Sequence, residues 1–290
     1  MPSSFVLADI AKSAWRVAVQ PAQFARRRQA RYRAAGLAGP GELTNCRIDT
    51  EAMHTGSEAR CRYTAELTHR HLCDYRHAGE DWTWKPWLGT AAVIPLCEQA
   101  TGDAYLAQVA ARTGKAFARS VGKARRLGYA TSFFPPQCFE AGIAEILGSR
   151  LMRSGGLVPY ALLPRRRPTD DTGLPNGHRP KSWCRRHWTL HFGVLAQPPA
   201  GGGQQRLVGF VKIRRSGTLV HALQIMGHGD HMHAGINDLM HAELIVWLIG
   251  DPDGLAAGVT HYLYGAIEHA GEGLAQWKLR RGFKPMLIAG

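Results

Sequence analysis

The chain has 290 residues, of which 45% are hydrophobic and 20% are charged, so it can bury a full core and is not a disordered or low-complexity protein. Its formal net charge of +14 at pH 7 favours anionic partners such as RNA, phosphorylated cofactors or acidic membrane surfaces. A charge of this size is equally consistent with a role in solubility alone.

The amino-terminal segment lacks the apolar stretch of a secretory signal, because Asp9, Lys12 and Arg16 interrupt it. No run of the sequence approaches the ~20 apolar residues of a membrane span. The six cysteines are scattered without a C-x2-C pair. We therefore expect a cytoplasmic protein with free thiols and no membrane span.

Residues 1–100 are predicted to form a helical but irregular extension. Residues 5–35 have a helical pattern with an arginine-rich side, which indicates either a contact with RNA or anionic lipid or a solvated helix face. Residues 44–77 contain cysteines and histidines, of which only Cys73 and His77 approach the spacing of zinc ligands, so we assign no metal ligand. The three tryptophans of residues 81–88 are either a base-stacking platform or an anchor for a loop.

Residues 101–182 are predicted to form an α/β segment. A basic amphipathic helix pattern covers residues 102–128, a strand pattern covers 129–134, and a further helix pattern covers 138–151. Residues 163–182 are rich in proline, glycine and charge, which predicts a long loop.

Residues 183–290 carry the most regular pattern of the chain. Strands are predicted at residues 188–195, 207–213, 219–226 and 259–264, and helices at 236–248 and 273–281. The second and third strands face each other across a short turn, as in a hairpin. A loop rich in histidine and glycine separates the third strand from the first of these helices.

This order of elements resembles the carboxy-terminal half of the GNAT acyltransferase superfamily, and it is most similar to the branch of Fem-type aminoacyl-tRNA-dependent transferases. The residues that carry the resemblance are Leu207–Phe210, Gly235 with the helix after it, Tyr264-Gly265, Trp277-Lys278, Gly282-Phe283 and Pro285. The resemblance begins near Trp188. It implies an α/β fold with a GNAT-like mixed sheet flanked by helices, preceded by a helical extension or a degenerate second GNAT half.

The resemblance also implies an activity. The chain would move an acyl or aminoacyl group from acyl-CoA or aminoacyl-tRNA to an amine on a small molecule or peptide, with no permanently bound cofactor. The segment 149–156 and Tyr160 look like the acceptor side of this branch, so Arg153 and Tyr160 are expected to bind the acceptor. An ordinary helix terminus is the alternative interpretation of Arg153.

The donor is expected beside the loop that precedes Gly235. The strands before this loop and after the following helix should be parallel, and where they part an extended donor can pair with exposed backbone groups. Helix-terminal amides near Gly235 would attract a phosphate. Only this glycine matches the phosphate-loop pattern of the superfamily, which favours a donor other than acyl-CoA. The expected donor-binding residues are Ile225, Met226, Gly227, His233, Ala234, Gly235, Ile236, Asn237 and Lys278.

Two residues are expected to be catalytic. His228 is the candidate base, and Tyr264 replaces the usual tyrosine acid because Lys278 stands at that position. The alternatives are a structural loop histidine and a core tyrosine. The sequence leaves two other functions open: a non-catalytic RNA-binding protein on a GNAT-like fold, and a hydrolase that binds a metal through residues 228–233.

Overall fold

A computed structural model describes residues 33–37, 43–49, 59–73, 75, 90–150, 152–153, 156–157, 171–174, 178–197, 205–267 and 272–289. Most of the helix predicted at residues 5–35, the tryptophan segment 81–88, Tyr160 and most of the loop 163–182 lie outside these residues. Only the backbone of Arg153 is described.

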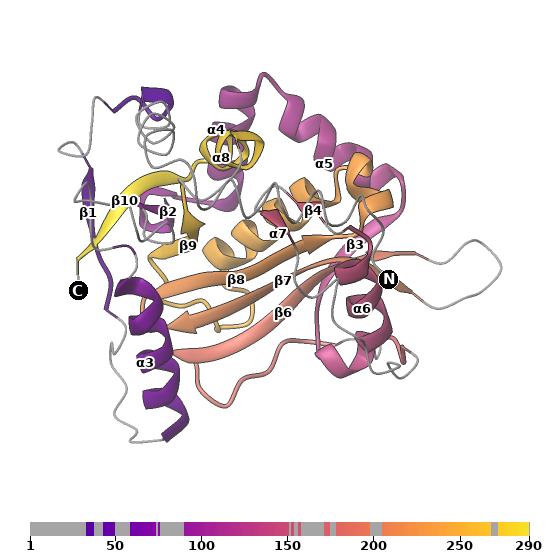
Figure 1. Ribbon diagram of the computed structural model, residues 1–290, viewed down its shortest axis with the longest axis horizontal. Helices are drawn as coiled ribbons and strands as arrows, with labels where there is room; N and C mark the ends of the chain where they lie inside the picture. Colours follow the sequence, from indigo (N-terminus) through magenta and orange to yellow (C-terminus); the bar gives the residue numbers. More distant parts are fainter. Residues whose placement is uncertain are drawn as a thin grey trace.

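Eight strands form one mixed sheet in the order β1-β10-β2-β9-β8-β7-β6-β3 (Figure 1). The strands are β1 (Thr44–Arg47), β2 (Ala91–Pro95), β3 (Tyr129–Phe134), β6 (His187–Ala196), β7 (Arg206–Ser216), β8 (Leu219–Gly227), β9 (His261–Ala266) and β10 (Lys284–Ala289). β1–β10 and β8–β9 are parallel, and the other neighbours are antiparallel. β4 (Met152–Arg153) and β5 (Gly156–Leu157) form a separate small hairpin. The predicted α/β fold with a mixed sheet is confirmed.

Six α-helices and three 3-10 helices are described. The α-helices are α3 (Ala59–Cys73), α4 (Gly102–Thr113), α5 (Ala116–Arg126), α6 (Glu140–Gly148), α7 (Ile236–Gly250) and α8 (Glu272–Arg280). The 3-10 helices are η2 (Leu96–Glu98), η3 (Pro136–Phe139) and η5 (Gly229–Ala234). None of the helices in the described part of the chain is long and apolar enough to cross a membrane.

The single helix predicted over residues 102–128 is two helices, α4 and α5. Thr101 caps α4, because its hydroxyl accepts a hydrogen bond from the backbone N–H of Ala104 at 3.1 Å. α4 ends where Gly114 and Lys115 have left-handed φ values of 55° and 67°. The chain therefore bends between two amphipathic helices that an apolar pattern alone does not separate.

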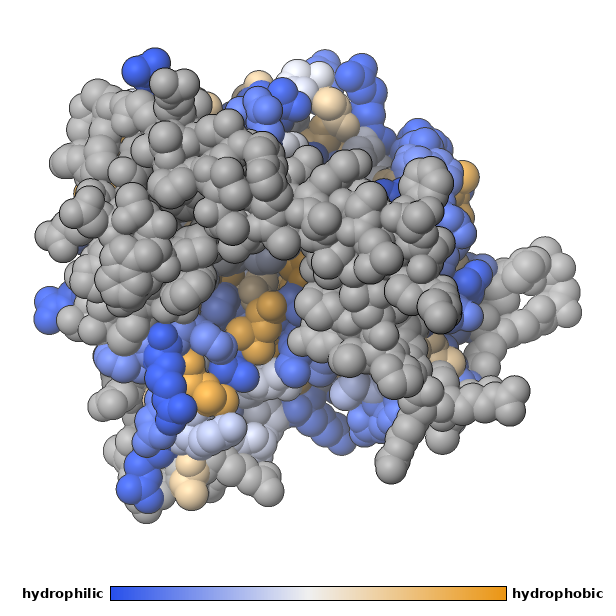
Figure 2. Space-filling model, in the orientation of Figure 1, coloured by the Kyte–Doolittle hydropathy of each residue, from blue (hydrophilic) through white to orange (hydrophobic). Residues whose placement is uncertain are grey.

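Helices cover both faces of the sheet. Along β7, Val208 and Val211 pack in the main core cluster with residues of α7, α4 and α5. Leu207 and Phe210 point to the opposite face, where Ile146 of α6 packs against them. α3 lies on this second face as well (Figure 1). Figure 2 shows that the visible described surface is mainly hydrophilic, with a few apolar residues near its centre.

The sheet draws strands from all three predicted segments of the chain. β1 and β2 come from residues 1–100, β3 comes from residues 101–182, and the other strands come from residues 183–290. All five residues of β2 are buried, as expected for a strand with neighbours on both sides and helices on both faces.

The parallel strands β8 and β9 part after a short paired stretch. They pair only over residues 219–221 of β8 and 261–263 of β9, while β9 stays paired with β2 as far as Ala266. Residues 219–222 of β8 are buried, whereas residues 223–226 are half-buried. We call residues 223–227 and 264–266 the β8–β9 seam. The predicted parting of these strands is confirmed.

Candidate functional site

The segment after β8, residues 228–235, which we call the histidine loop, lies at one end of the seam. His228 caps η5, because its Nδ1 accepts a hydrogen bond from the backbone N–H of Asp230 at 3.3 Å. The Asp230 side chain is 90% exposed. A neutral imidazole that accepts at Nδ1 carries its proton on Nε2. His228 is therefore placed beside the seam as a hydrogen-bond donor.

A second histidine of the loop has a partner that the sequence did not indicate. The Tyr129 hydroxyl of β3 lies 2.7 Å from Nδ1 of His231. The ring of His228 lies edge-on to that of His231, with centroids 5.3 Å apart. Burial, followed by the electrostatic influence of His228 and Arg206, lowers the pKa of His231. His231 is thus neutral at pH 7, the form that accepts a proton.

The end of α6 holds the histidine loop from another side. The Ser149 hydroxyl accepts a hydrogen bond from the Gly229 N–H at 3.0 Å, and Arg150 donates to the Gly229 carbonyl at 3.2 Å. A Cβ at Gly229 would lie 2.9 Å from Nε of Arg150, so only glycine fits this approach. The segment predicted to bind the acceptor therefore begins in contact with the histidine loop.

The start of α7 is packed against α5. Gly235 has φ 85°, and a Cβ there would lie 2.5 Å from the Ser120 hydroxyl and 2.6 Å from the Ser120 carbonyl oxygen. Lys123 of α5 donates to the backbone carbonyl of His233 at 2.9 Å. The side chains of Ala234 and Ile236 are buried in the main core. These two predicted donor-binding residues can therefore offer a donor only their backbone groups.

Asn237 and the end of β8 face each other. A Cβ at Gly227 would lie 2.7 Å from Oδ1 of Asn237. This oxygen is buried and has no hydrogen-bond partner within the described structure. Ile225 and Met226, also predicted to bind the donor, are half-buried along the seam. A ligand N–H or O–H can reach this oxygen only if the neighbouring side chains move, because almost none of its surface is accessible.

Tyr264 lies on the opposite side of the seam, on β9. Its ring packs edge-on to Trp277, and burial raises the pKa of Tyr264 to about 12. The hydroxyl is thus protonated at neutral pH. Lys278, a predicted donor-binding residue, is buried: its ammonium donates to the Ala266 carbonyl at 2.8 Å and lies 4.5 Å from the centre of the Tyr264 ring. Lys278 ties α8 to the end of β9.

Exposed cations line the α5 side of the histidine loop. They are Lys115, Arg119, Lys123, Arg125 and Arg126. Within the described part of the chain, only Arg125 of this set forms an ion pair, with Glu243 of α7. We call these five residues the α5 basic surface. Such a surface attracts a ligand with several phosphates.

The histidine loop does not gather a set of metal ligands in the described structure. His233 is exposed, and the Asp230 side chain points to solvent. The group of three ligating side chains found among the described residues lies elsewhere, at Cys61, Cys184 and His187.

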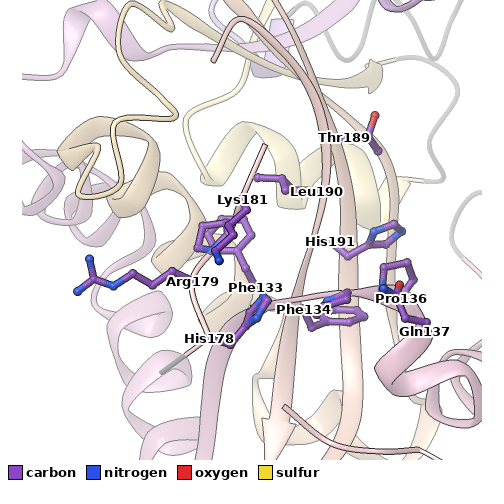
Figure 3. A pocket seen from close by; sticks show the side chains of 12 residues that line it. Phe133, Phe134, Pro136, Gln137, His178, Arg179, Lys181, Thr189, Leu190 and His191 are labelled. Atoms are coloured by element: carbon purple, nitrogen blue, oxygen red, sulfur yellow. The ribbon is translucent and has the colours of Figure 1, made fainter. Parts of the chain in front are cut away.

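A cavity of about 560 Å³ lies beside residues 189–191, in the first half of β6 (Figure 3). His178, Arg179 and Lys181 line it together with His191, whose pKa is lowered to about 4 by burial and by Lys212. On β7, Lys212 is paired with His191 of the cavity. Four residues earlier on the same strand, the carbonyl of Val208 accepts a hydrogen bond from the N–H of His228. At ~3.3 Å per residue, about 13 Å of strand separates the cavity from the histidine loop.

No protein-family model matches the chain, and no curated protein matches it. Among solved structures, the chain is similar to the crystal structure of FemX, with a TM-score of 0.48 and 12% sequence identity over 76% of this chain. The match covers 66% of the FemX chain. A likeness at this level sets neither the family nor the activity of the chain. The mixed sheet with its parted strands is itself compatible with the GNAT-like fold expected from the sequence.

Proposed function

We propose that this protein is an N-acyltransferase that moves an aminoacyl group from aminoacyl-tRNA to an amine acceptor. The observation that carries the proposal is the β8–β9 seam, where β8 loses its β9 partner after residue 221, before the histidine loop begins. Backbone groups of residues 222–226, which have no β9 partner, can bind an extended donor arm there by adding hydrogen bonds of the strand type. The reacting carbonyl would then lie at the end of β8, beside the histidine loop.

The side chains around the seam suit attack by an amine on an ester. The neutral amine attacks the carbonyl carbon, and its proton passes to Nε2 of His231 when Nδ1–H donates to the Tyr129 hydroxyl. Nε2–H of His228 stabilises the developing oxyanion. His231 then passes this proton to the leaving hydroxyl of the donor. Tyr264 is level with Ala222 of β8, six residues or about 20 Å of strand before His228, so this assignment gives it no proton-transfer step. His228 thus changes from candidate base to oxyanion donor in this assignment, because its Nδ1 is occupied.

The α5 basic surface favours tRNA over acyl-CoA as the donor. It presents five cations beside the histidine loop, which is more than a single small nucleotide can contact. The whole chain also carries a net charge of +14. The start of α7 also packs closely on Ser120, which leaves little space for a phosphate at Gly235. Arg153 and Tyr160 remain our proposed acceptor-binding residues.

Donor binding can be tested by its salt dependence. If five phosphates are contacted, the affinity for aminoacyl-tRNA should fall about a hundredfold to a thousandfold between roughly 50 and 200 mM salt. The double variant Arg119→Glu/Arg126→Glu should lower the slope by about two. Arg70→Glu on α3 changes an exposed arginine on the other face of the sheet and should leave the slope unchanged. A flat salt response, or tighter binding of acetyl-CoA than of tRNA, would contradict the tRNA assignment.

Chemistry can be tested by following loss of the aminoacyl ester and formation of an amide, with pooled amines and peptides as acceptors. His231→Gln should slow the single-turnover rate by about 10²–10⁴-fold while tRNA affinity is retained. His69→Gln, an exposed histidine of α3, is the matched control. If tRNA binds but the ester is lost no faster than in buffer with any amine, the non-catalytic RNA-binding alternative is correct.

A further inference from the structure

Three buried side chains that are distant in sequence meet on the α3 face of the sheet. Cys61 lies in the first turn of α3, Cys184 lies in the segment before β6, and His187 is the first residue of β6. Their exposures are 3%, 7% and 2%. One ligand atom from each lies within 4.8 Å of the other two. Two thiols and an imidazole are the ligands that zinc prefers in proteins.

The spacing of these atoms is close to that of a metal site. Zinc–sulfur and zinc–nitrogen bonds of about 2.3 and 2.0 Å at a tetrahedral angle place the sulfur and nitrogen about 3.6 Å apart. The Cys184 Sγ lies 3.9 Å from Nδ1 of His187. The other ligand atoms lie within 4.8 Å of one another, so shifts of at most about 1 Å would bring all three onto one ion.

A backbone donor is directed at the sulfur of Cys184. The N–H of Arg186 donates to the Cys184 Sγ at 3.3 Å, so the turn from Cys184 to His187 directs an amide at the sulfur.

A ligand at this position would also explain how α3 is held. The buried stripe of this helix consists of Cys61, Ala65, Thr68 and Leu72, so it buries little apolar surface. At its other end α3 contacts the sheet through His71, whose ring lies edge-on to His221 of β8 at 5.8 Å. The amino-terminal end of α3 has Cys61 as its largest buried contact.

We propose that Cys61, Cys184 and His187 form a binding site for zinc, or for another soft transition-metal ion, that fastens the start of α3 to the start of β6. Binding releases the two thiol protons and forms two metal–sulfur bonds and one bond to Nδ1, which leaves one coordination position for a further ligand. The site is separate from the histidine loop and is independent of the proposed transferase activity.

The test is metal analysis of the tag-free, full-length protein purified from zinc-supplemented cells without chelators. We expect about one zinc per chain. Cys61→Ser and Cys184→Ser should each reduce the metal content at least tenfold. Cys97→Ser, an exposed cysteine elsewhere, is the matched control and should retain the metal. Zinc that is unchanged in both serine variants would overturn the proposal.

A second measurement on the unmutated protein covers the case in which a serine variant fails to fold. Replacement of zinc by cobalt should give a near-ultraviolet thiolate-to-cobalt charge-transfer band, which is absent if the thiols are not ligands. Alkylation in denaturant, followed by mass spectrometry with and without reductant, tests whether the two cysteines form a disulfide instead. A disulfide between Cys61 and Cys184, or a protein that takes up no zinc or cobalt, would overturn the proposal.

Discussion

Gly235→Ala tests the close packing of α5 on the start of α7. The added methyl group meets two penalties. A residue with a side chain at φ 85° costs about 1–2 kcal/mol, and the Cβ would lie 2.6 Å from the carbonyl oxygen of Ser120, which cannot rotate away as the hydroxyl can. Forced displacement of a packed helix adds about 1–3 kcal/mol. We expect the variant to lose about 2–5 kcal/mol in the free energy of unfolding.

Gly114→Ala separates these two penalties. Gly114 also has a positive φ, 55°, but a Cβ there has nothing within 4 Å. It should lose only about 1–2 kcal/mol. Urea unfolding followed by circular dichroism gives both values under the same conditions. If Gly235→Ala costs no more than Gly114→Ala, the close contact between α5 and α7 is not rigid, and the inference that α5 limits the space at Gly235 fails.

Two further predictions concern buried polar groups. Burial lowers the pKa of His221 and of His241 to about 3. Between about pH 6.5 and 3 the unfolded chain therefore binds protons that the folded chain does not. The free energy of unfolding should fall as the pH falls through this range. His221→Gln should lower the slope of unfolding free energy against pH by about 1.4 kcal/mol per unit, measured by urea titrations from pH 7 to 4.5. Tyr105→Phe removes the hydroxyl that bonds Nε2 of His241 at 2.7 Å and a backbone carbonyl at 2.8 Å, and should cost about 1–3 kcal/mol for each group left unpaired. In the same urea assay Tyr63→Phe, 60% exposed, should change stability by less than about 0.5 kcal/mol; equal losses in the two tyrosine variants would refute this account.

The sequence predicted the elements whose patterns are long and regular. The hairpin of β7 and β8, the strand β3 and the helix α7 begin and end within about three residues of their predicted bounds. Each has an apolar alternation or a helical period that no other structure satisfies. The parting of β8 and β9 was also expected, but from the resemblance to the GNAT superfamily and not from a local pattern.

Other elements could not be predicted because their packing is made by distant residues. α3 falls in a segment that looked irregular, since its buried stripe contains small or polar residues such as Ala65 and Thr68. β1 has a polar sequence and is a strand only because β10, from the other end of the chain, pairs with it.

The candidate site also depends on contacts between residues that are distant in sequence. His228 and Tyr264 were proposed as catalytic from their places at or just after the ends of predicted strands, and they remain predictions. The contact between Tyr129 and His231 joins residues 102 positions apart, and no local pattern signals it. The meeting of Cys61 with Cys184 likewise depends on where α3 crosses the sheet.

The position of β2 affects how the chain folds during synthesis. Both neighbours of β2, β9 and β10, are made near the end of translation, since β9 begins at His261. At about 5–20 residues per second, the ribosome needs on the order of ten to thirty seconds to deliver them. Throughout that interval the wholly apolar β2 has neither edge paired, so a nascent chain depends on chaperones or on neighbouring helices to keep it from aggregating.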